Sequence, residues 1–325
     1  MKKVISIGEA LIDFTPSQRG CELKDVVGFE RVAGGAPANV SAVVAKLGGK
    51  SNFISKLGQD AFGDYIIEVL KDVNVNTDYV LRTNKANTGL AFVSLKEDGN
   101  RDFSFYRNPS ADMLLEESEV KQEWFEDCHC LHFCSVDLIE CPMKGAHKKA
   151  IEYALKNKSI ISFDPNVRLP LWDSEELCRE AILEFLPLAH IVKISDEELE
   201  FITGYNTMDK AKEVLFTGNV NLVLFTRGKD GAEIYTRDKT IEIPGNIVDV
   251  VDTTGAGDSF IGSFLFKLLQ DDVNIDRLNS ISDKKLKGYL TFSNYYAAYS
   301  TTKKGAIGSY ATLEDITNYI NQNSI

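Results

Sequence analysis

Long uncharged apolar runs are missing from this sequence. No segment approaches the roughly 18 consecutive apolar residues that a transmembrane helix needs. The amino-terminal stretch MKKVISIGEALIDF starts with two lysines and an apolar run, but Glu9 and Asp13 interrupt that run too early for a signal peptide. The stretch therefore predicts a buried first strand, and we expect a cytoplasmic protein that does not bind membranes.

Positive charge is also scarce. The 325 residues contain 48 Asp and Glu against 36 Lys and Arg, which gives a net charge of −12. Such an excess of acid disfavours a broad surface for nucleic acid or acidic lipid, because either partner requires a basic field. ATP remains a possible ligand, since helix N-termini, a few cationic side chains and a metal ion suffice to bind it.

Only six cysteines are present, and without a secretory context they predict reduced thiols. The segment CHCLHFC places Cys128, Cys130, His132 and Cys134 at alternating positions. On one face of a strand such neighbours lie roughly 6.6 Å apart. This spacing is too wide for several of them to close one tetrahedral site, so it argues against zinc.

The sequence alternates instead between short β-rich runs and helical patterns. This alternation predicts an α/β fold with a doubly wound, mostly parallel sheet flanked by helices, in a single domain over residues 1–325. The expected strands cover residues 3–8, 51–57, 130–135, 159–164, 190–195 and 221–226, and the expected helices cover 37–47, a stretch after Asp60, and about 142–157.

Two segments depart from the alternation. Residues 11–33 show no long helical period, and residues 88–107 have the pattern of a hairpin around Asp98–Gly99. One interpretation is a small inserted sheet, built from about 11–35 and 87–107, that acts as a lid over a site at the carboxyl ends of the main strands. The other interpretation, an extension of the main sheet at its edge, fits the sequence equally well.

The segment DTTGAGDSF at residues 252–260 carries the strongest chemical signal. Apolar residues recur at helical spacing behind Asp258, so we expect a helix that begins near Ser259. Gly255, Ala256 and Gly257 would then lie at its N-terminus, where free N–H groups favour an anion. Asp258 stands either as an N-cap after a glycine turn or as a general base beside an anion hole for a phosphoryl group, and both can hold.

DTTGAGD resembles the carboxyl-terminal signature of the ribokinase-like (PfkB) family of sugar and nucleoside kinases. AGGAPANVSAVVAKLGGKSNFISKLGQDAFG, residues 33–63, resembles the amino-terminal signature of the same family. The likeness extends from GEALID (8–13) to KKGA (303–306), nearly the whole chain. Within the family, FYRNPSADMLL (105–115) and FDPNVRLPLW (163–172) are most similar to fructokinases.

The resemblance implies a role for individual residues around the sugar. It implies that Asp258 is the catalytic base and that Gly255, Ala256 and Gly257 form the anion hole. The residues that it assigns to the sugar are Asp13, Gly34, Gly35, Asn39, Arg107 and Arg168. Each has a plain alternative: Asn39 as a polar residue in the first turn of a helix, Asp13 as a turn residue before Pro16, and the arginines as surface ion-pair partners.

The resemblance also implies sites for ATP, Mg²⁺ and K⁺. The residues that it assigns to ATP are Lys193, Ser195, Glu198, Thr226, Gly228, Gly231 and Asn294, with Glu198 acting indirectly on Mg²⁺. Those that it assigns to K⁺, largely through backbone carbonyls, are Asp252, Thr254, Ser300, Lys303, Gly305 and Ser309. Many relatives carry Asn-x-x-Glu where this chain has Ser195-Asp196-Glu197-Glu198. Ser195 and Glu198 also have the spacing of a capping box.

These features together predict an ATP-dependent sugar kinase, most similar to a fructokinase that phosphorylates a primary hydroxyl. A 2-keto-3-deoxygluconate kinase shares the two arginines and is the nearest alternative. A nucleoside kinase fits less well, because Arg107 and Arg168 suit a compact polar substrate. A sugar or nucleotide sensor without catalysis is disfavoured by Asp258 and its glycines. The resemblance further implies a homodimer that pairs through the lid sheet.

Overall fold

The structure is a computed structural model that describes residues 2–18, 20–95 and 101–323. Its larger sheet has nine strands in the order β13-β12-β11-β10-β9-β8-β1-β4-β5. From β11 to the end of this order at β5, neighbouring strands are parallel. Beyond β11, β12 and β13 add an antiparallel edge. The bounds are β1 (Lys3–Ile7), β4 (Ser51–Gly58), β5 (Val80–Thr83), β8 (Cys128–Cys134), β9 (Ile160–Asp164), β10 (Ile191–Ser195), β11 (Leu222–Thr226), β12 (Ala232–Tyr235) and β13 (Thr240–Ile243).

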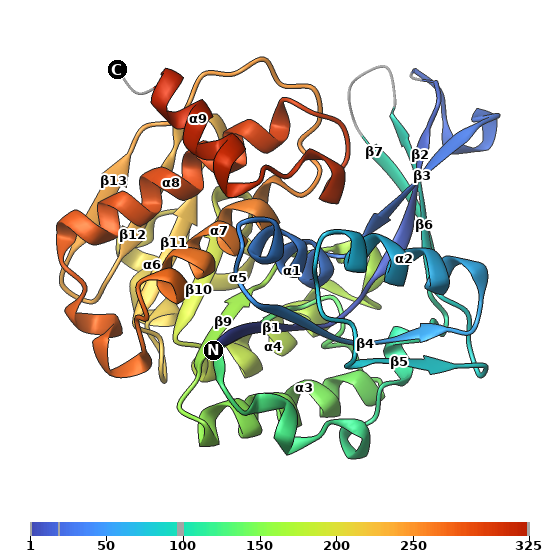
Figure 1. Ribbon diagram of the computed structural model, residues 1–325, viewed down its shortest axis with the longest axis horizontal. Helices are drawn as coiled ribbons and strands as arrows, with labels where there is room; N and C mark the ends of the chain where they lie inside the picture. The colour runs from blue at the N-terminus through green and yellow to red at the C-terminus, as the bar shows by residue number, and fades with distance from the viewer. Residues whose placement is uncertain (1, 19, 96–100, 324–325) are drawn as a thin grey trace.

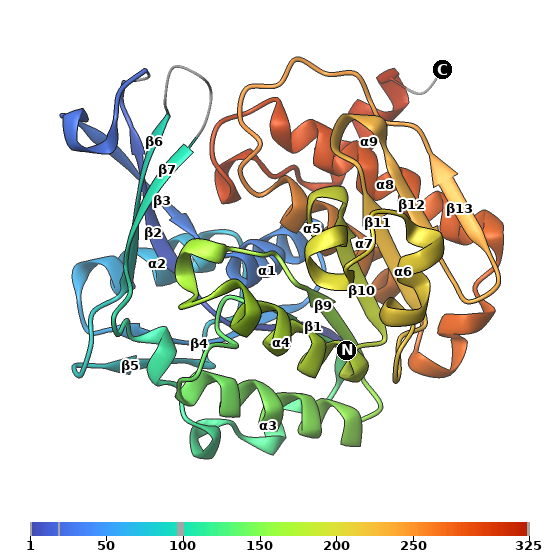
Figure 2. The ribbon, with the colours of Figure 1, turned by 180° about the vertical axis from the view of Figure 1, so that it is seen from behind.

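Helices cover both faces of this sheet (Figures 1 and 2). One core lies under α3 to α6 and contains Ile5, Phe133 and Phe163; a second lies under α1, α7 and α8 and contains Val4 and Cys130; a third joins α1 and α2 and contains Phe53. Successive residues of β1 and β8 thus point to opposite cores, as side chains along a strand do. The bounds are α1 (Ala36–Lys46), α2 (Ala61–Asp72), α3 (Pro142–Lys156), α4 (Glu175–Phe185), α5 (Asp196–Thr203), α6 (Met208–Leu215), α7 (Ala256–Gln270), α8 (Asp283–Thr301) and α9 (Leu313–Asn323).

The α/β prediction is confirmed, with strands at all six expected places and helices at the three expected ones. The helix expected at 37–47 is α1, but it is buried on nearly every side rather than on one face. It packs between the sheet and α7, where Gly262 allows close approach. A Cβ at position 262 would lie 2.8 Å from Cβ of Val43.

The two irregular segments form a second sheet of four strands, in the order β3-β2-β6-β7. Its strands are β2 (Leu11–Pro16), β3 (Phe29–Gly34), β6 (Gly89–Leu95) and β7 (Arg101–Tyr106). The alternative of an edge extension is wrong, because β5 ends the larger sheet and none of these four strands pairs with it. The smaller sheet projects from the body beside α2 (Figures 1 and 2). The expected turn at Asp98–Gly99 lies outside the described residues.

The carboxyl ends of the parallel strands lie along one edge of the larger sheet, which is where open α/β sheets bind ligands. Acidic residues end or follow three of these strands: Glu9 after β1, Asp137 after β8 and Asp164 at the end of β9. Within the described ranges, no helix combines the length and apolarity needed to cross a bilayer.

Candidate active site

The start of α7 differs from the sequence prediction. The helix begins at Ala256 rather than near Ser259, because Gly255 adopts a left-handed conformation (φ 74°, ψ 8°) and is itself the N-cap. A Cβ at position 255 would overlap with the hydroxyl of Tyr310, which donates a hydrogen bond to the Gly255 carbonyl at 3.2 Å. The interpretation of Asp258 as an N-cap is therefore wrong, since Asp258 lies within the first turn.

The Asp258 carboxylate is buried and directed toward α1. It is 8% exposed, and its Oδ2 accepts a hydrogen bond of 2.8 Å from Nδ2 of Asn39. Burial raises the pKa of Asp258 above its ordinary value, while the Asn39 hydrogen bond and the charges of Arg168 and Lys193 partly oppose the rise. The result is a carboxylate more basic than one exposed to water.

A buried ammonium lies beside this turn. The Lys193 Nζ is 3.2 Å from both carboxylate oxygens of Asp164, on the neighbouring strand β9. A Cβ at position 257 would lie 3.1 Å from that nitrogen, so the ammonium lies against Gly257. Burial raises the pKa of Asp164 to about 7, and the nearby carboxylates raise the pKa of Lys193. The first turn of α7 thus combines the backbone amides of Gly257 and Asp258 with a fixed cation, an arrangement that favours an anion, while the Ala256 N–H donates to the Thr253 carbonyl at 3.2 Å.

The residues expected at the sugar form a continuous group next to Asp258. Asp13 on β2 lies over Gly34, where a Cβ would overlap with Oδ2 of the aspartate. Gly35 has φ 108° and starts α1, which carries Asn39. The N–H of Ala36 donates to Oε1 of Glu9 at 2.9 Å, and burial raises the pKa of Glu9 to about 7. The structure therefore brings Asp13, Gly34, Gly35 and Asn39 together with Asp258.

The two arginines lie in different environments. Arg107 is 7% exposed and is paired with the buried side chains of Asp112 and Asp137, so its interpretation as a surface ion-pair partner is wrong. Arg168 is exposed, and its Nη1 donates to the carbonyl of Val167 at 3.0 Å. It is nevertheless close enough to Asp258 for its charge to lower the pKa of that carboxyl.

The residues expected at ATP occupy the ends of β10 and β11 and the turns beyond them. Ser195 pairs in register with Thr226. The predicted capping box is confirmed: the Ser195 N–H donates to Oε2 of Glu198 at 2.9 Å. The other oxygen of Glu198 accepts from the N–H of Val167 at 2.8 Å. Both carboxylate oxygens of Glu198 thus bind backbone.

Gly228 (φ 51°) and Gly231 (φ 104°) form the turn after β11. A Cβ at position 231 would lie 2.7 Å from the Gly245 nitrogen, so this turn touches the segment after β13. Asn294 on α8 donates to the Pro244 carbonyl of the same segment at 2.9 Å. Gly228, Gly231 and Asn294 therefore border one region.

The residues expected at K⁺ cluster between the start of α7 and the end of α8. Oδ1 of Asp252 accepts from the N–H (2.9 Å) and hydroxyl (2.7 Å) of Thr254, and Oδ2 accepts from the Gly305 N–H (3.0 Å). Ser300 lies 3.1 Å from Ser259, hydroxyl to hydroxyl. Lys303 directs its ammonium toward the Tyr299 ring, and the Ser309 hydroxyl donates to the Ala306 carbonyl at 2.8 Å. Among the described residues no group of three or more His, Cys, Asp or Glu side chains is placed to hold a metal ion.

Four acidic residues near this site are absent from the sequence assignments: Glu9, Asp112, Asp137 and Asp164. The position of Asp164 at the carboxyl end of a predicted strand, and of Glu9 just beyond another, was a usable signal.

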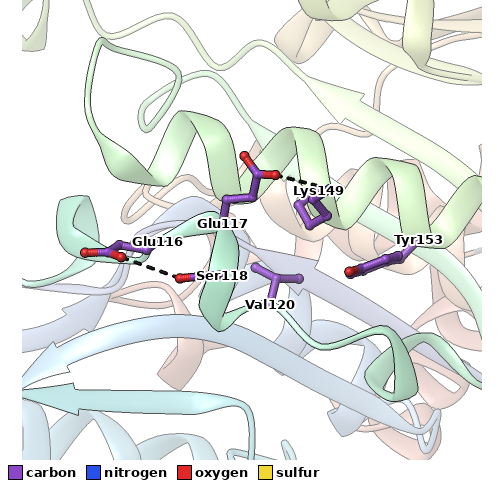
Figure 3. A pocket seen from close by; sticks show the side chains of 6 residues that line it. All are labelled: Glu116, Glu117, Ser118, Val120, Lys149 and Tyr153. Atoms are coloured by element: carbon purple, nitrogen blue, oxygen red, sulfur yellow. Dashed lines mark hydrogen bonds and ion pairs between the residues drawn. The ribbon is translucent and has the colours of Figure 1, made fainter.

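The hollow in Figure 3, between η3 (Glu117–Glu119) and α3, is lined by none of the site residues; its Lys149 pairs with Glu117 at 3.1 Å.

The chain is similar over nearly its whole length to known sugar kinases. It is 44% identical to "Probable fructokinase-5" of Arabidopsis thaliana, over 96% of this chain and 95% of the relative. The structure of a fructokinase with bound ATP from Xylella fastidiosa superposes with a TM-score of 0.93 at 33% identity and covers 100% of both chains. A double mutant of the Vibrio cholerae O395 fructokinase, bound to fructose, ADP and potassium ion, superposes with a TM-score of 0.86 at 28% identity and covers 98% of each chain.

The family model described as "pfkB family carbohydrate kinase" matches residues 1–313. This match covers both signature segments and every group described above, from Glu9 to Ser309. The chain belongs to the pfkB family of carbohydrate kinases.

Proposed function

We propose that this protein is an ATP-dependent fructokinase, which converts D-fructose and ATP to D-fructose 6-phosphate and ADP. The observation that carries the proposal is the buried Asp258, held by Asn39 in the first turn of α7, in a carbohydrate kinase similar to fructokinases over its full length. The relative bound to ATP supports ATP as the phosphoryl donor.

In the proposed reaction, a primary hydroxyl oxygen of the sugar attacks the γ-phosphorus of ATP. The new O–P bond forms while the bond from the γ-phosphorus to the β–γ bridging oxygen breaks, and ADP leaves. Asp258 accepts the hydroxyl proton, and the raised pKa of this buried carboxylate makes it a better base than an exposed aspartate. The amides of the α7 first turn and the Lys193 ammonium stabilise the negative charge on the transferring group.

The rest of the site supports substrate binding. Asp13, Gly34, Gly35 and Asn39 hold the sugar hydroxyls, and Arg168 reaches the same region. The turn at Gly228–Gly231, with Thr226 and Asn294, borders the nucleotide. Mg²⁺ would neutralise charge on the phosphates of ATP. Glu198, whose two oxygens accept backbone N–H groups, would act on it indirectly through water. Ser195 serves as a helix cap in place of the asparagine of many relatives.

A monovalent cation fits the cluster around Asp252. The last turn of α8, a 19-residue helix that ends at Thr301, presents carbonyl oxygens and the negative end of the helix dipole. The Asp252 carboxylate binds both Thr254 and Gly305, so it ties this region to the loop before α7. We assign K⁺ to this place, where it would fix the loop that carries Gly255 without touching the phosphates. The potassium ion in the Vibrio cholerae relative supports the assignment.

We interpret the four-stranded sheet as a lid within one ribokinase-like domain, made of about 11–35 and 87–107. One face of it carries an aromatic cluster. Phe14 and Phe92 stack with centroids 4.6 Å apart, Phe29 and Tyr106 contact Phe92 edge-on, and Tyr106 is 63% exposed. This partly exposed cluster supports a homodimer in which two lids pair.

A substrate panel tests the proposal. At fixed ATP and Mg²⁺, we expect kcat/KM for fructose to exceed that for ribose, adenosine and 2-keto-3-deoxygluconate by about tenfold or more, because a pocket matched to a sugar's hydroxyls rejects analogues that lack them. A coupled ADP-release assay measures all four. A higher value for 2-keto-3-deoxygluconate would replace the fructokinase assignment by the keto-acid kinase, and no turnover with any of them would favour a sensor.

Removal of the proposed base should lower the rate of the chemical step. Asp258→Asn should reduce kcat by a factor on the order of 10² to 10⁴, with a much smaller change in sugar affinity, because a general base acts only as the proton leaves. Asp271→Asn, at the other end of α7, is the matched control and should keep its kcat. Near-parental turnover in Asp258→Asn would contradict the assignment.

The acid limb of the pH profile should report Asp258. The base works when ionised, so kcat should fall as pH drops through its raised pKa, above the ordinary aspartate range. The Asn39 hydrogen bond lowers this pKa, so Asn39→Ala should move the acid limb to higher pH. Profiles of kcat at saturating fructose for both proteins measure the shift. An unmoved or lower limb would show that another group controls it.

Turnover should depend on the monovalent cation. We expect a higher kcat in potassium buffer than in sodium or tetramethylammonium buffer of equal ionic strength, because only a cation of suitable size orders the 252–258 loop. Thr254→Val removes a hydroxyl that binds Asp252 and should weaken the potassium response. Equal rates in all three buffers would rule out the monovalent site while leaving the kinase assignment intact.

A further inference from the structure

Arg107 lies in a buried cluster that contains more acid than base. Its Nη2 is hydrogen-bonded to Asp112 and to Asp137, the latter at 2.5 Å, and both aspartates are 1% exposed. Ser110 donates to the other oxygen of Asp112 at 2.5 Å. Glu9 is also buried and close enough for its charge to act on Arg107. One guanidinium thus faces three carboxyl groups.

The cluster lies at the base of the small sheet, on the side of the proposed sugar site. Arg107 directly follows β7, and a Cβ at Gly89, where β6 begins, would lie 3.2 Å from Cγ of Arg107. Gly89 pairs with Leu11, and Leu11 pairs with Gly34. The paired residues Gly89, Leu11 and Gly34 thus form a row that runs across the sheet from the Arg107 side chain.

The same cluster is linked to the catalytic residues. Glu9 accepts the N–H of Ala36 at the start of α1, and Asn39 in that helix binds Asp258. Arg107 and its acids therefore border the region between the sheet and Asp258.

The net charge of the cluster is never positive when either aspartate is ionised, because one carboxylate suffices to cancel the guanidinium. Burial raises the pKa of Asp137 and of Glu9, the latter to about 7, so these two groups can hold protons at neutral pH without leaving Arg107 uncompensated. An anionic substrate group placed here would lose its hydration and gain no free cation in return. A neutral hydroxyl carries no such penalty.

We propose that Asp112 and Asp137 are specificity-determining residues, which cancel the charge of Arg107 and thereby favour neutral sugars over sugar acids. This inference rests on the proposed function, since it places the sugar beside Arg107. In this proposal Arg107 positions the neutral sugar by hydrogen bonding and does not bind a substrate carboxylate. Discrimination against the acid then comes from compensated charge, without a residue that blocks the carboxylate sterically.

The test compares a neutral with an anionic substrate in one variant. Because either carboxylate alone cancels the guanidinium, the variant replaces both: Asp112→Asn combined with Asp137→Asn keeps the shape of the side chains and leaves the Arg107 charge uncompensated. We expect the ratio of kcat/KM for 2-keto-3-deoxygluconate to that for fructose to rise about tenfold or more, because close charge pairs at a buried site are strongly coupled. Addition of Arg107→Gln to the same variant should abolish the rise, an effect that a merely structural role for the two aspartates does not predict.

Glu119→Gln is the matched control, because it removes one carboxylate from another inward-facing pair, Lys56–Glu119 at 2.5 Å. Its substrate ratio should equal the parental one. An unchanged ratio in the double variant, or a rise that persists without Arg107, would overturn the inference. If the double variant does not fold, the competition measurement on the parental enzyme decides.

One measurement needs no variant. The Ki of 2-keto-3-deoxygluconate as a competitor should exceed the KM of fructose by about tenfold in the parental enzyme, and an equal or lower Ki would overturn the inference. If the parental enzyme prefers another neutral sugar to fructose, the proposed function is wrong, and the comparison is made with that sugar instead.

Discussion

The hydrogen bond between Asn39 and Asp258 joins the starts of two helices that are 219 residues apart in sequence. It exists because α1 and α7 pack side by side, with Gly262 leaving room for Val43. Both helices begin at a glycine with positive φ, Gly35 and Gly255. The first turn of α7 presents backbone N–H groups beside the shared carboxylate, whereas at α1 the Ala36 N–H already donates to Glu9 and Pro37 has none. The residues proposed to bind the sugar and the first turn of α7 meet at this contact.

Burial of charge is the second constraint on this edge of the sheet. Glu9, Asp164, Lys193, Glu198, Arg107, Asp112, Asp137 and Asp258 are all buried. Such groups are tolerated only when each is paired or bound to backbone, since an isolated charge in the interior is costly. Lys193 with Asp164, and Arg107 with two aspartates, satisfy this requirement. The pairs leave no net cation at Arg107, and the charged group that lies against Gly257 is the Lys193 ammonium, itself paired with Asp164.

The two sheets differ in how far they are buried and in which site residues they carry. The larger sheet is buried between helices and holds the strand ends that carry Glu9, Asp164 and Ser195. The smaller sheet has a partly exposed aromatic face and contributes Asp13 and Gly34. The proposed lid would be the less enclosed part, as expected where a site must admit its substrate and then exclude water.

The sequence was enough to predict six strands of the larger sheet, three helices and the family, because hydrophobic period, capping residues and two long signatures are local patterns. It also determined the capping box at Ser195 and Glu198, four positions of one segment. It misplaced the start of α7, because apolar spacing does not reveal that Gly255 adopts a left-handed conformation and lets the helix begin at Ala256. The sequence did not show that Asn39 binds Asp258, that Lys193 lies against Gly257 or that Arg107 is buried between Asp112 and Asp137. These contacts join residues on different elements, and the sheet order and helix packing that bring them together are properties of the whole chain.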